Sequence, residues 1–537
     1  MNTISLRKAV VLAMVMGGSA PFADAAVSTY DPATQTVRIE VVDLQTPEGK
    51  ILTFNATLAL KQGAEGLELE LAGAAPVATP EGARAYFDAD ANTVFIPSVQ
   101  VGDKEYAATL ALVPGSNPLR FRLVRLHESQ FQGCPDFAQP IGVNACQLQG
   151  EYKGREIVLT NDTTWVLSGG VYIGGDNSEP ATLTIEPGTK IVGQQAADFL
   201  YIRRGSKINA IGSPSQPIVM TGALEQTPGE WGGLVLAGNA PVNGCNEGVS
   251  PCVQFNEAIT TESHGGDDPH DSSGILKYLQ IRYAGYPVRP DQELNGLTLA
   301  AVGDGTIVDY VEILEGADDG VEMFGGTVNL KHMVIVNAHD DSLDWGWGWT
   351  GSAQYVLAVQ RNDTDRCIEA DNNENNFDST PRAQPVIANF TCKGNPAGTQ
   401  AVVLRRGTGV NIVNSVFTDS PTCIRVDDEA TFRNAGTPDN LSGRFTVDHT
   451  LLNCPTSFDA KNPLFSVADW FHAQEGNLEG VDPLLDAKGM PLPGSPVLQG
   501  GSQAARTTVY GTTVPGTSFI GAFDGTVDWT AGWTSGL

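Results

Sequence analysis

The stretch from Ala317 to Gly351, ADDGVEMFGGTVNLKHMVIVNAHDDSLDWGWGWTG, decides the fold because it contains its own repeat. Three acidic residues return 22 positions later: Asp318, Asp319 and Glu322 recur as Asp340, Asp341 and Asp344. A repeat of this length is too short for a domain, but it matches one turn of a solenoid in which each coil rests on the previous one. The stretch therefore predicts a parallel β-helix, with equivalent residues stacked in ladders.

Strand-like runs continue this repeat and allow the coils to be counted. They are YLQIR at Tyr278, YVEIL at Tyr310, HMVIV at His332, YVLAV at Tyr355, NFTCK at Asn389, NSVFT at Asn414 and HTLLN at His449. The shortest spacings, 22 and 23 residues, are close to a bare coil, and longer ones indicate inserted loops. Two such insertions contain His264–Asp271 and Asp371–Asp378. Loops that leave one face of a solenoid commonly build its binding surface.

The first 25 residues have the pattern of a secretory signal peptide. Arg7 and Lys8 precede the apolar run Ala9–Met16, and small residues end at Ala25. No later segment is apolar for long enough to span a bilayer as a helix. We therefore expect a protein without transmembrane segments that is secreted, periplasmic or displayed at the cell surface, and that is a monomer.

Residues 27–126 contain an internal duplication. TYDPATQTVRI at Thr29–Ile39 corresponds to YFDADANTVFI at Tyr86–Ile96, and NATLAL at Asn55–Leu60 corresponds to AATLAL at Ala107–Leu112. Alternating apolar and polar residues in these runs predict half-buried strands, and hence a small β domain made of two similar halves. A linker at 127–150 separates it from the predicted β-helix with its C-terminal cap at 151–537.

Charge and cysteine content narrow the range of partners. The formal net charge of −30 disfavours nucleic acid and anionic lipid, and it suits divalent cations, cationic partners or neutral polymers. The alternative is that the high net charge serves only to keep the protein soluble.

An even number of cysteines in an exported chain favours disulfides between sequence neighbours. The expected pairs are Cys134 with Cys146, Cys245 with Cys252, Cys367 with Cys392, and Cys423 with Cys454.

Two further parts of the sequence resemble a known superfamily. LTIEPGTKIVG, PIVMTG and EWGGLVLAG, which end at Gly193, Gly222 and Gly238, resemble the opening coils of secreted right-handed parallel β-helix proteins of the pectate-lyase-like superfamily. The ending, FIGAFDG followed by DWTAGWT, is similar to that of exported bacterial β-helix proteins. The resemblance covers about 150–537 and implies an all-β fold.

The repeat extends into DRCIEAD, Asp365–Asp371, so that carboxylates form two columns over three coils. The first column contains Asp318, Asp340 and Asp365, the second contains Glu322, Asp344 and Glu369, and the inward column between them contains Val321, Leu343 and Ile368. Six oxygen-bearing side chains at strand spacing predict a site for a hard cation, with Ca²⁺ as the only cofactor. The alternative is that these carboxylates are solvated or accept hydrogen bonds from turn amides.

Two catalytic mechanisms are compatible with this face. In pectate-lyase-like enzymes a calcium-bound acidic sugar loses a proton to an arginine or lysine, and the resemblance makes Arg366, Arg405 and Arg425 candidates for that base. A glycoside hydrolase would instead use two carboxylates as acid and base, with Asp344 as a candidate. The third possibility is a structural or adhesive protein of the cell envelope without catalysis.

Three tryptophans follow the second acidic column directly. Trp345, Trp347 and Trp349 alternate with glycines and would share one face of an extended strand. A flat indole platform beside carboxylates suits a sugar ring. The alternative is that the indoles cover a corner inside the fold. Together these features favour an exported β-helix that binds an extracellular polymer, in particular a carbohydrate.

Overall fold

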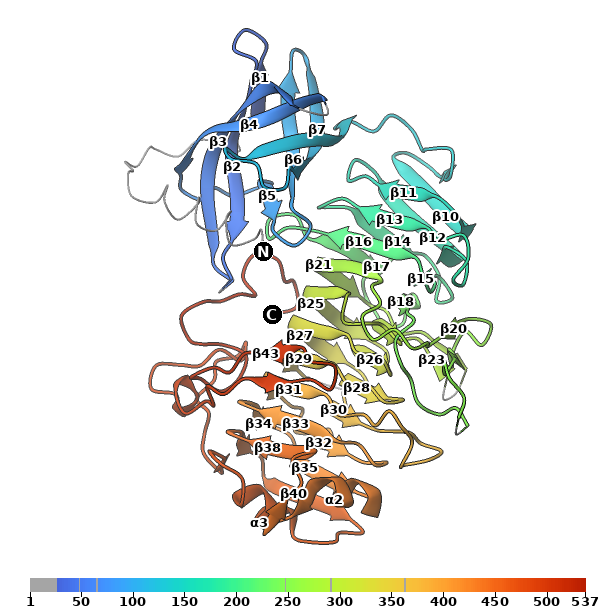
Figure 1. Cartoon of the computed structure of the whole chain (residues 1–537), viewed down its shortest axis with the longest axis vertical. Coiled ribbons are helices and arrows are strands. Elements are labelled where there is room, and N and C mark those ends of the chain that lie inside the picture. Colours follow the sequence, from blue (N-terminus) through green and yellow to red (C-terminus); the bar gives the residue numbers. More distant parts are fainter. Residues whose placement is uncertain (1–26, 48, 64–65, 247, 290–291, 362–363) are drawn as a thin grey trace. The chain divides into compact units, whose positions relative to one another are not determined.

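The computed structural model describes residues 27–537 apart from 48, 64–65, 247, 290–291 and 362–363 (Figure 1). The chain divides into two compact units. The first contains the residues up to Cys134 together with Ser213–Gln216, and the second contains Pro135–Gly212 and Pro217–Leu537. The predicted signal peptide lies outside the described residues. The prediction of a parallel β-helix preceded by a separate small β domain is confirmed.

The first unit is a sheet in the order β1-β2-β3-β4-β8-β7-β6-β5, with β1 also paired to β6 and β2 to β5. Its strands are β1 (Ser28–Asp31), β2 (Thr36–Gln45), β3 (Ile51–Gly63), β4 (Gly66–Pro76), β5 (Ala85–Asp88), β6 (Thr93–Val101), β7 (Lys104–Leu112) and β8 (Arg120–Glu128). The unit has two halves, β1–β4 and β5–β8, and each strand of one half has partners equivalent to those of the corresponding strand of the other half. The duplicated residues Ile39 and Ile96 are both buried in its core, as the sequence repeat requires.

The second unit winds three parallel sheets. Sheet 1 contains the end of β12 and then β15 (Phe199–Ile202), β18 (Gly233–Ala237), β24 (Leu297–Ala300), β26 (Val321–Phe324), β28 (Asp341–Gly346), β30 (Arg366–Ala370), β32 (Gln400–Leu404), β35 (Thr422–Asp427) and β40 (Thr456–Lys461).

Sheets 2 and 3 share five long strands. These are β21 (Gly274–Arg282), β25 (Ile307–Gly316), β27 (Asn329–Ala338), β29 (Ser352–Val359) and β31 (Val386–Lys393). Sheet 2 also contains β11 (Glu156–Leu159), β13 (Thr182–Ile185), β16 (Lys207–Ile211), β33 (Val410–Val413) and β38 (Phe445–Asp448). Sheet 3 also contains β10 (Ala145–Tyr152), the start of β12 (Thr164–Ile173), β14 (Lys190–Gly193), β17 (Ile218–Gly222), β34 (Val416–Thr418), β39 (Leu451–Asn453) and β41 (Leu478–Glu479).

Short elements cover the ends and loops of the coils. They are β9 (Gln139–Pro140), β19 (Gln254–Phe255), β20 (Ser263–His264), β22 (Pro287–Arg289), β23 (Gln292–Glu293), α2 (Glu429–Ala435), β36 (Gly436–Thr437), β37 (Asn440–Leu441), α3 (Val467–His472), η2 (Pro496–Leu498), β42 (Arg506–Thr507) and β43 (Thr513–Val514). The segments 238–273 and 371–385, called the first and second insertions below, both follow strands of sheet 1 (Figure 1).

The chain bends from sheet 2 to sheet 3 at a residue with a positive φ. These residues are Tyr278, Tyr310, His332, Tyr355 and Asn389 in the five long strands, and Asn414 and His449 between the short strands of the later coils, with φ between 47° and 59°. Such a conformation is uncommon outside glycine, and stacking compensates it here. The ring centroids of Tyr278 and Tyr310 are 4.6 Å apart, those of Tyr310 and His332 are 4.3 Å apart, and those of His332 and Tyr355 are 5.0 Å apart.

The C-terminal residues return along this corner column. Asn389 and Asn414 donate to the hydroxyl of Thr517, and the ring of Trp533 meets the ring of Tyr310 edge-on at 5.9 Å. Glu312 lies in sheet 3 with a side chain that is 0% exposed. Its carboxylate accepts hydrogen bonds from the backbone N–H of Ser535 at 2.8 Å and of Gly536 at 2.8 Å. The C-terminal segment thus covers the side of the helix over several coils.

We predict that Glu312→Ala lowers the free energy of unfolding by about 1 to 3 kcal/mol, because the backbone N–H groups of Ser535 and Gly536 lose their acceptor. Urea unfolding measures this. In a chain truncated after Phe523 the same substitution should cost much less, since Ser535 and Gly536 are absent. An equal cost in both chains would contradict a role for Glu312 in holding the C-terminal segment.

Candidate functional site

The predicted carboxylate ladder lies on sheet 1 in the expected register. Glu322 pairs with Asp344, and Asp344 pairs with Glu369 on the next coil. Their apolar neighbours Val321, Leu343 and Ile368 also pair in sequence and are 0% exposed, so they face the core. Alternation along the strands then places the carboxylates on the outer face.

Asp319, in the turn before β26, and Asp341, the first residue of β28, accept hydrogen bonds from the following coil. The carboxylate of Asp319 accepts the backbone N–H of Asp341 at 2.9 Å, and that of Asp341 accepts the N–H of Arg366 at 3.1 Å. Both side chains are buried. The Asp-Asp pairs of the repeat contain both residues, but the two predicted columns include only the first aspartate of each pair, Asp318 and Asp340. One oxygen of Asp319 and one of Asp341 thus have a structural role.

The carboxylates converge in four overlapping groups, in each of which one oxygen per residue lies within 4.8 Å of the others. The groups are Asp318, Asp319 and Asp340; Asp319, Glu322 and Asp344; Asp340, Asp341 and Asp365; and Asp341, Asp344 and Glu369. Each of the six predicted ligands thus shares a group with Asp319 or Asp341, and Asp340 and Asp344 share groups with both. The ladder is one continuous acidic cluster.

Arginines neutralise the C-terminal half of this cluster. Arg366 contacts Asp365 at 2.9 Å and Glu369 at 2.9 Å. Arg405 pairs with Glu369 and, through Nε, contacts Asp371 at 2.9 Å. Asp371 was not predicted as a member of the site. Because each of these carboxylates has a guanidinium beside it, this half is close to charge balance.

The N-terminal half has no such compensation. Within the described part of the chain, Asp318, Asp319, Glu322 and Asp344 form no ion pair. Among the described residues, Asn295 donates a side-chain hydrogen bond to Glu322 at 2.6 Å. Like charges therefore face one another across neighbouring coils, which is unfavourable unless protons or a cation offset it.

Burial and mutual repulsion raise the pKa values of these carboxyls. Burial, followed by the charge of Asp340, raises the pKa of Asp318 to about 8, and the same two causes raise that of Asp341 to about 8. The pKa of Asp344 is raised well above its ordinary value by burial and then by Glu322. The pKa of Glu322 is raised likewise, by burial and then by Glu257.

Glu257 reaches the cluster from the first insertion. Burial and the charges of Glu293 and Glu374 raise its pKa to about 7. The insertion packs its apolar residues Ala258 and Ile259 against Tyr201 and Val235, which lie on the outer face of sheet 1. The sequence did not predict this contribution, because the insertion lies outside the coil repeat.

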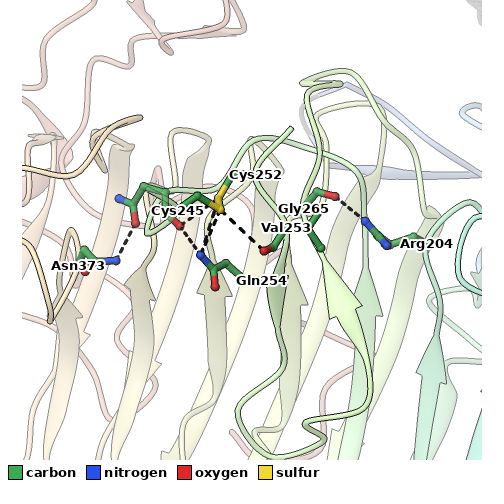
Figure 2. The surroundings of a disulfide bond; sticks show 8 residues. Arg204, Cys245, Cys252, Val253, Gln254, Gly265 and Asn373 are labelled. Carbon is green, nitrogen blue, oxygen red and sulfur yellow. Dashed lines mark hydrogen bonds between the residues drawn. A yellow bond between two sulfur atoms is a disulfide. The ribbon is translucent and has the colours of Figure 1, made fainter. Parts of the chain in front are cut away.

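A buried ion pair and a hydrogen bond to the backbone hold the first insertion to the earlier coils. Arg203 contacts Glu262 at 2.7 Å, and Arg204 donates to the carbonyl of Gly265 at 2.8 Å. Figure 2 shows the second of these contacts at one end of the insertion. The loop that carries Glu257 is therefore anchored on the helix.

The predicted platform of three exposed indoles is wrong. Trp345 pairs with the inward residue Met323, and both Trp345 and Trp349 are 0% exposed. Their ring centroids are 5.6 Å apart inside the fold. Strand β28 ends at Gly346, and Trp347 has a φ of 54°, so the alternation that would align three indoles stops after the first. Trp347 alone is half-buried.

The candidate bases differ in their surroundings. Arg366 and Arg405 lie in the cluster, whereas Arg425 pairs with Asp427 at 3.0 Å and Asp459 at 3.3 Å. The pKa of Arg425 is raised, first by its hydrogen bond to Asp427, whereas burial lowers that of Arg405. In the column of paired residues on sheet 1, Val403 lies between Glu369 and Arg425. The structure thus does not bring Arg425 together with the other two.

Three of the predicted cysteine pairs are confirmed. Disulfides join Cys245 to Cys252, Cys367 to Cys392, and Cys423 to Cys454. Cys134 and Cys146 are also disulfide-bonded. The bond between Cys367 and Cys392 connects β30, which carries Glu369, to β31, so it fixes the coil at the arginine-neutralised end of the cluster.

Parallel coils, a stacked corner column and an acidic outer sheet define a β-helix protein of the pectate-lyase type. Residues 150–482, more than half of the chain, match the family model of the pectate-lyase like beta helix domain, and the chain belongs to this family. No curated protein and no solved structure matches it. Among the described residues, no helix is long and apolar enough to cross a membrane.

We predict that, without divalent cations, the protein loses stability as the pH rises from about 6.5 to about 8.5. The folded state retains protons on Asp318 and Asp341, with pKa values of about 8, that the unfolded chain releases near pH 4. Because the unfolded state binds fewer protons, the free energy of unfolding should fall by about 1 kcal/mol per pH unit for each retained proton.

Urea unfolding in a chelating buffer at several pH values measures this slope. His264, whose pKa burial lowers to about 3, changes its proton binding only below its ordinary value of 6.5 and does not contribute in this range. The variant carrying Asp318→Asn and Asp341→Asn should show a flatter slope. A stability that stays constant or rises over this range in the unmutated protein would contradict the raised pKa values.

Proposed function

We propose that this protein is exported and binds an extracellular polysaccharide on the outer face of sheet 1, with a calcium ion in the N-terminal half of the acidic cluster. The observation that carries the proposal is the contrast within the cluster. Arginines pair with Asp365, Glu369 and Asp371, whereas no described cationic side chain forms an ion pair with Asp319, Glu322 or Asp344. The site is therefore short of positive charge at one defined place.

The donor set in that place fits a hard cation. Asp319, Glu322 and Asp344 offer carboxylate oxygens within 4.8 Å of one another. Calcium binds oxygens at about 2.3 to 2.6 Å, so two ligands on opposite sides of the ion are separated by about 4.6 to 5.2 Å. Asp318 and Asp340 lie beside this group and would extend the shell. Asp365 and Glu369, two of the six predicted ligands, are less suitable because arginines occupy them.

A bound cation would create the affinity for a polymer. It would replace the protons that the raised pKa values retain, and its remaining coordination positions would accept hydroxyl or carboxylate oxygens of a sugar. A solenoid face presents such positions along an extended surface, which suits a chain rather than a single small molecule. Membership of the pectate-lyase like family and the disulfide-bonded cysteines support an extracellular polysaccharide as the partner.

We predict that calcium raises the melting temperature by several degrees and that Asp344→Asn abolishes the rise, because a ligand that binds the native state stabilises it. Thermal unfolding with calcium and with chelator measures both effects. Asp459→Asn is the matched control: Asp459 belongs to the same sheet but has a 47% exposed side chain paired with Arg425. The absence of a calcium effect in the unmutated protein would contradict the cation site.

We further predict calcium-dependent binding to an acidic polysaccharide, because the ion can bridge the two sets of carboxylates. Affinity electrophoresis in gels containing polygalacturonate, alginate or neutral xylan measures the retardation. Asp344→Asn should weaken retardation by about tenfold or more, and Asp459→Asn should leave it unchanged. Retardation that is equal with calcium and with chelator would contradict a bridging ion.

A second candidate function is a polysaccharide lyase on the same face. The observation that favours it is the position of Arg405, which contacts Glu369 and Asp371 one coil beyond Asp344 and remains 26% exposed at its side chain. As a base it would take the proton beside the sugar carboxylate. The electron pair would form a carbon–carbon double bond and expel the glycosidic oxygen, which would take a proton from water.

The reaction products distinguish a lyase from a hydrolase and from a protein that only binds the polysaccharide. A lyase acting on the same polysaccharides would generate unsaturated ends that absorb in the ultraviolet, and Arg405→Lys should reduce their formation. A hydrolase would release reducing ends without that absorbance. Calcium-dependent binding without either product would assign the face to binding alone.

A further inference from the structure

A cavity of about 710 Å³ lies outside the acidic cluster, beside the disulfide between Cys245 and Cys252. Its lining comes from three parts of the chain: the first insertion, the second insertion and Tyr510 in the turn between β42 and β43. The volume falls within the range of about 300 to 1,000 Å³ that is typical of small-molecule sites. None of its lining residues belongs to the carboxylate ladder.

Buried amides join the two insertions that form the walls. Asn243 of the first insertion donates to the side chain of Asn372 at 3.0 Å and to the carbonyl of Pro381 at 3.0 Å, and Asn373 donates back to Asn243 at 2.9 Å. The three asparagines are at most 2% exposed. Each of these hydrogen bonds contributes about 0.5 to 1.5 kcal/mol to holding the insertions together. The walls are therefore preformed.

The disulfide fixes the rim of the cavity. It closes the loop from Cys245 to Cys252, and the amide of Gln254 lies against the sulfur of Cys245 at 3.5 Å (Figure 2). Behind the rim, Gly244 packs on the ring of Trp347, where a Cβ would come within 2.8 Å of the ring. This is the contact that the half-buried Trp347 makes in place of the predicted exposed platform.

Tyr510 is held in place by its own hairpin. Val514 of β43 is buried in an apolar cluster with Val386, Ala388 and Val413, and Arg506 of β42 contacts Asp448 at 2.7 Å. The turn between the two strands therefore has a defined position. Tyr510 is half-buried and contributes an aromatic ring to the third wall of the cavity.

The lining is polar and close to neutral. It offers short uncharged polar side chains from Asn246, Ser250, Asn376, Ser379 and Thr380. No lysine or arginine is among the described lining residues. Of the two carboxylates among the described lining residues, Asp378 is balanced by Arg382 at 2.8 Å and Arg433 at 3.0 Å, which leaves Asp267. An anionic ligand would find no counter-charge here, whereas neutral hydroxyl groups would find donors and acceptors.

The cavity is also lined by apolar residues. Pro241, Pro269, Pro381 and Tyr510, whose side chains are rings, are among the lining residues. A sugar ring has hydroxyl groups at its edge and C–H groups on its faces, so it needs both kinds of contact at once. We propose that this cavity is a second binding site, specific for an uncharged oligosaccharide and independent of the cation.

The site is tested by isothermal titration calorimetry on the full-length mature protein in a chelating buffer, so that the cation site is empty. The probes are cellotetraose, xylotetraose, maltotetraose and mannotetraose, with tetragalacturonate as the acidic comparison. We expect one neutral tetrasaccharide to bind at a single site and the acidic one not to bind. Asp344→Asn should leave this binding unchanged, which separates it from the proposed function.

Variants of the lining assign the binding to the cavity. Tyr510→Ala should weaken it about tenfold or more through loss of ring contact. Asn246→Trp, at an exposed position on the rim, should block the cavity while leaving the melting temperature unchanged, and Tyr30→Ala in the first unit is the matched tyrosine control. Failure of all four neutral probes to bind, or binding that survives both cavity variants, would overturn the proposal.

Discussion

The structure depends on one constraint: parallel coils place equivalent residues about 5 Å apart, strand upon strand. Whatever side chain stands at a position in one coil must tolerate its counterpart in the next. On the inner face this produces the apolar column of Val321, Leu343 and Ile368. At the corner between sheets 2 and 3 it allows rings and asparagines to stack, and this stacking compensates a backbone conformation that few residues adopt alone.

On the outer face of sheet 1 the same constraint concentrates negative charge. Successive coils compensate this negative charge in different ways. The coils around Glu369 use Arg366 and Arg405, so the charges cancel within the protein. Among the described residues no arginine forms an ion pair with Glu322 or Asp344, and there burial and repulsion between the carboxyls raise their pKa values. The acidic face is thus a structural consequence of the repeat at one end and a candidate binding site at the other.

Much of this could be predicted from the sequence. The 22-residue offset determined the register of Glu322 with Asp344, and the neighbouring cysteines gave three correct disulfides. The tryptophans were predicted wrongly because the strand ends at Gly346, and a change to a positive φ at Trp347 leaves no trace in an alternating pattern. The approach of Glu257 and the amide contacts of Asn243 could not be predicted, since insertions fold back by contacts that carry no period.

The central claim is that a cation binds where the carboxylates lack arginines, and terbium luminescence tests it most directly. Terbium substitutes for calcium and emits when a nearby indole transfers energy to it, and Trp345 follows Asp344 directly in β28. The account predicts emission that saturates with added terbium, is displaced by calcium and disappears in Asp344→Asn but not in Asp459→Asn. Emission that is unchanged by Asp344→Asn, or absent from the unmutated protein, would contradict it.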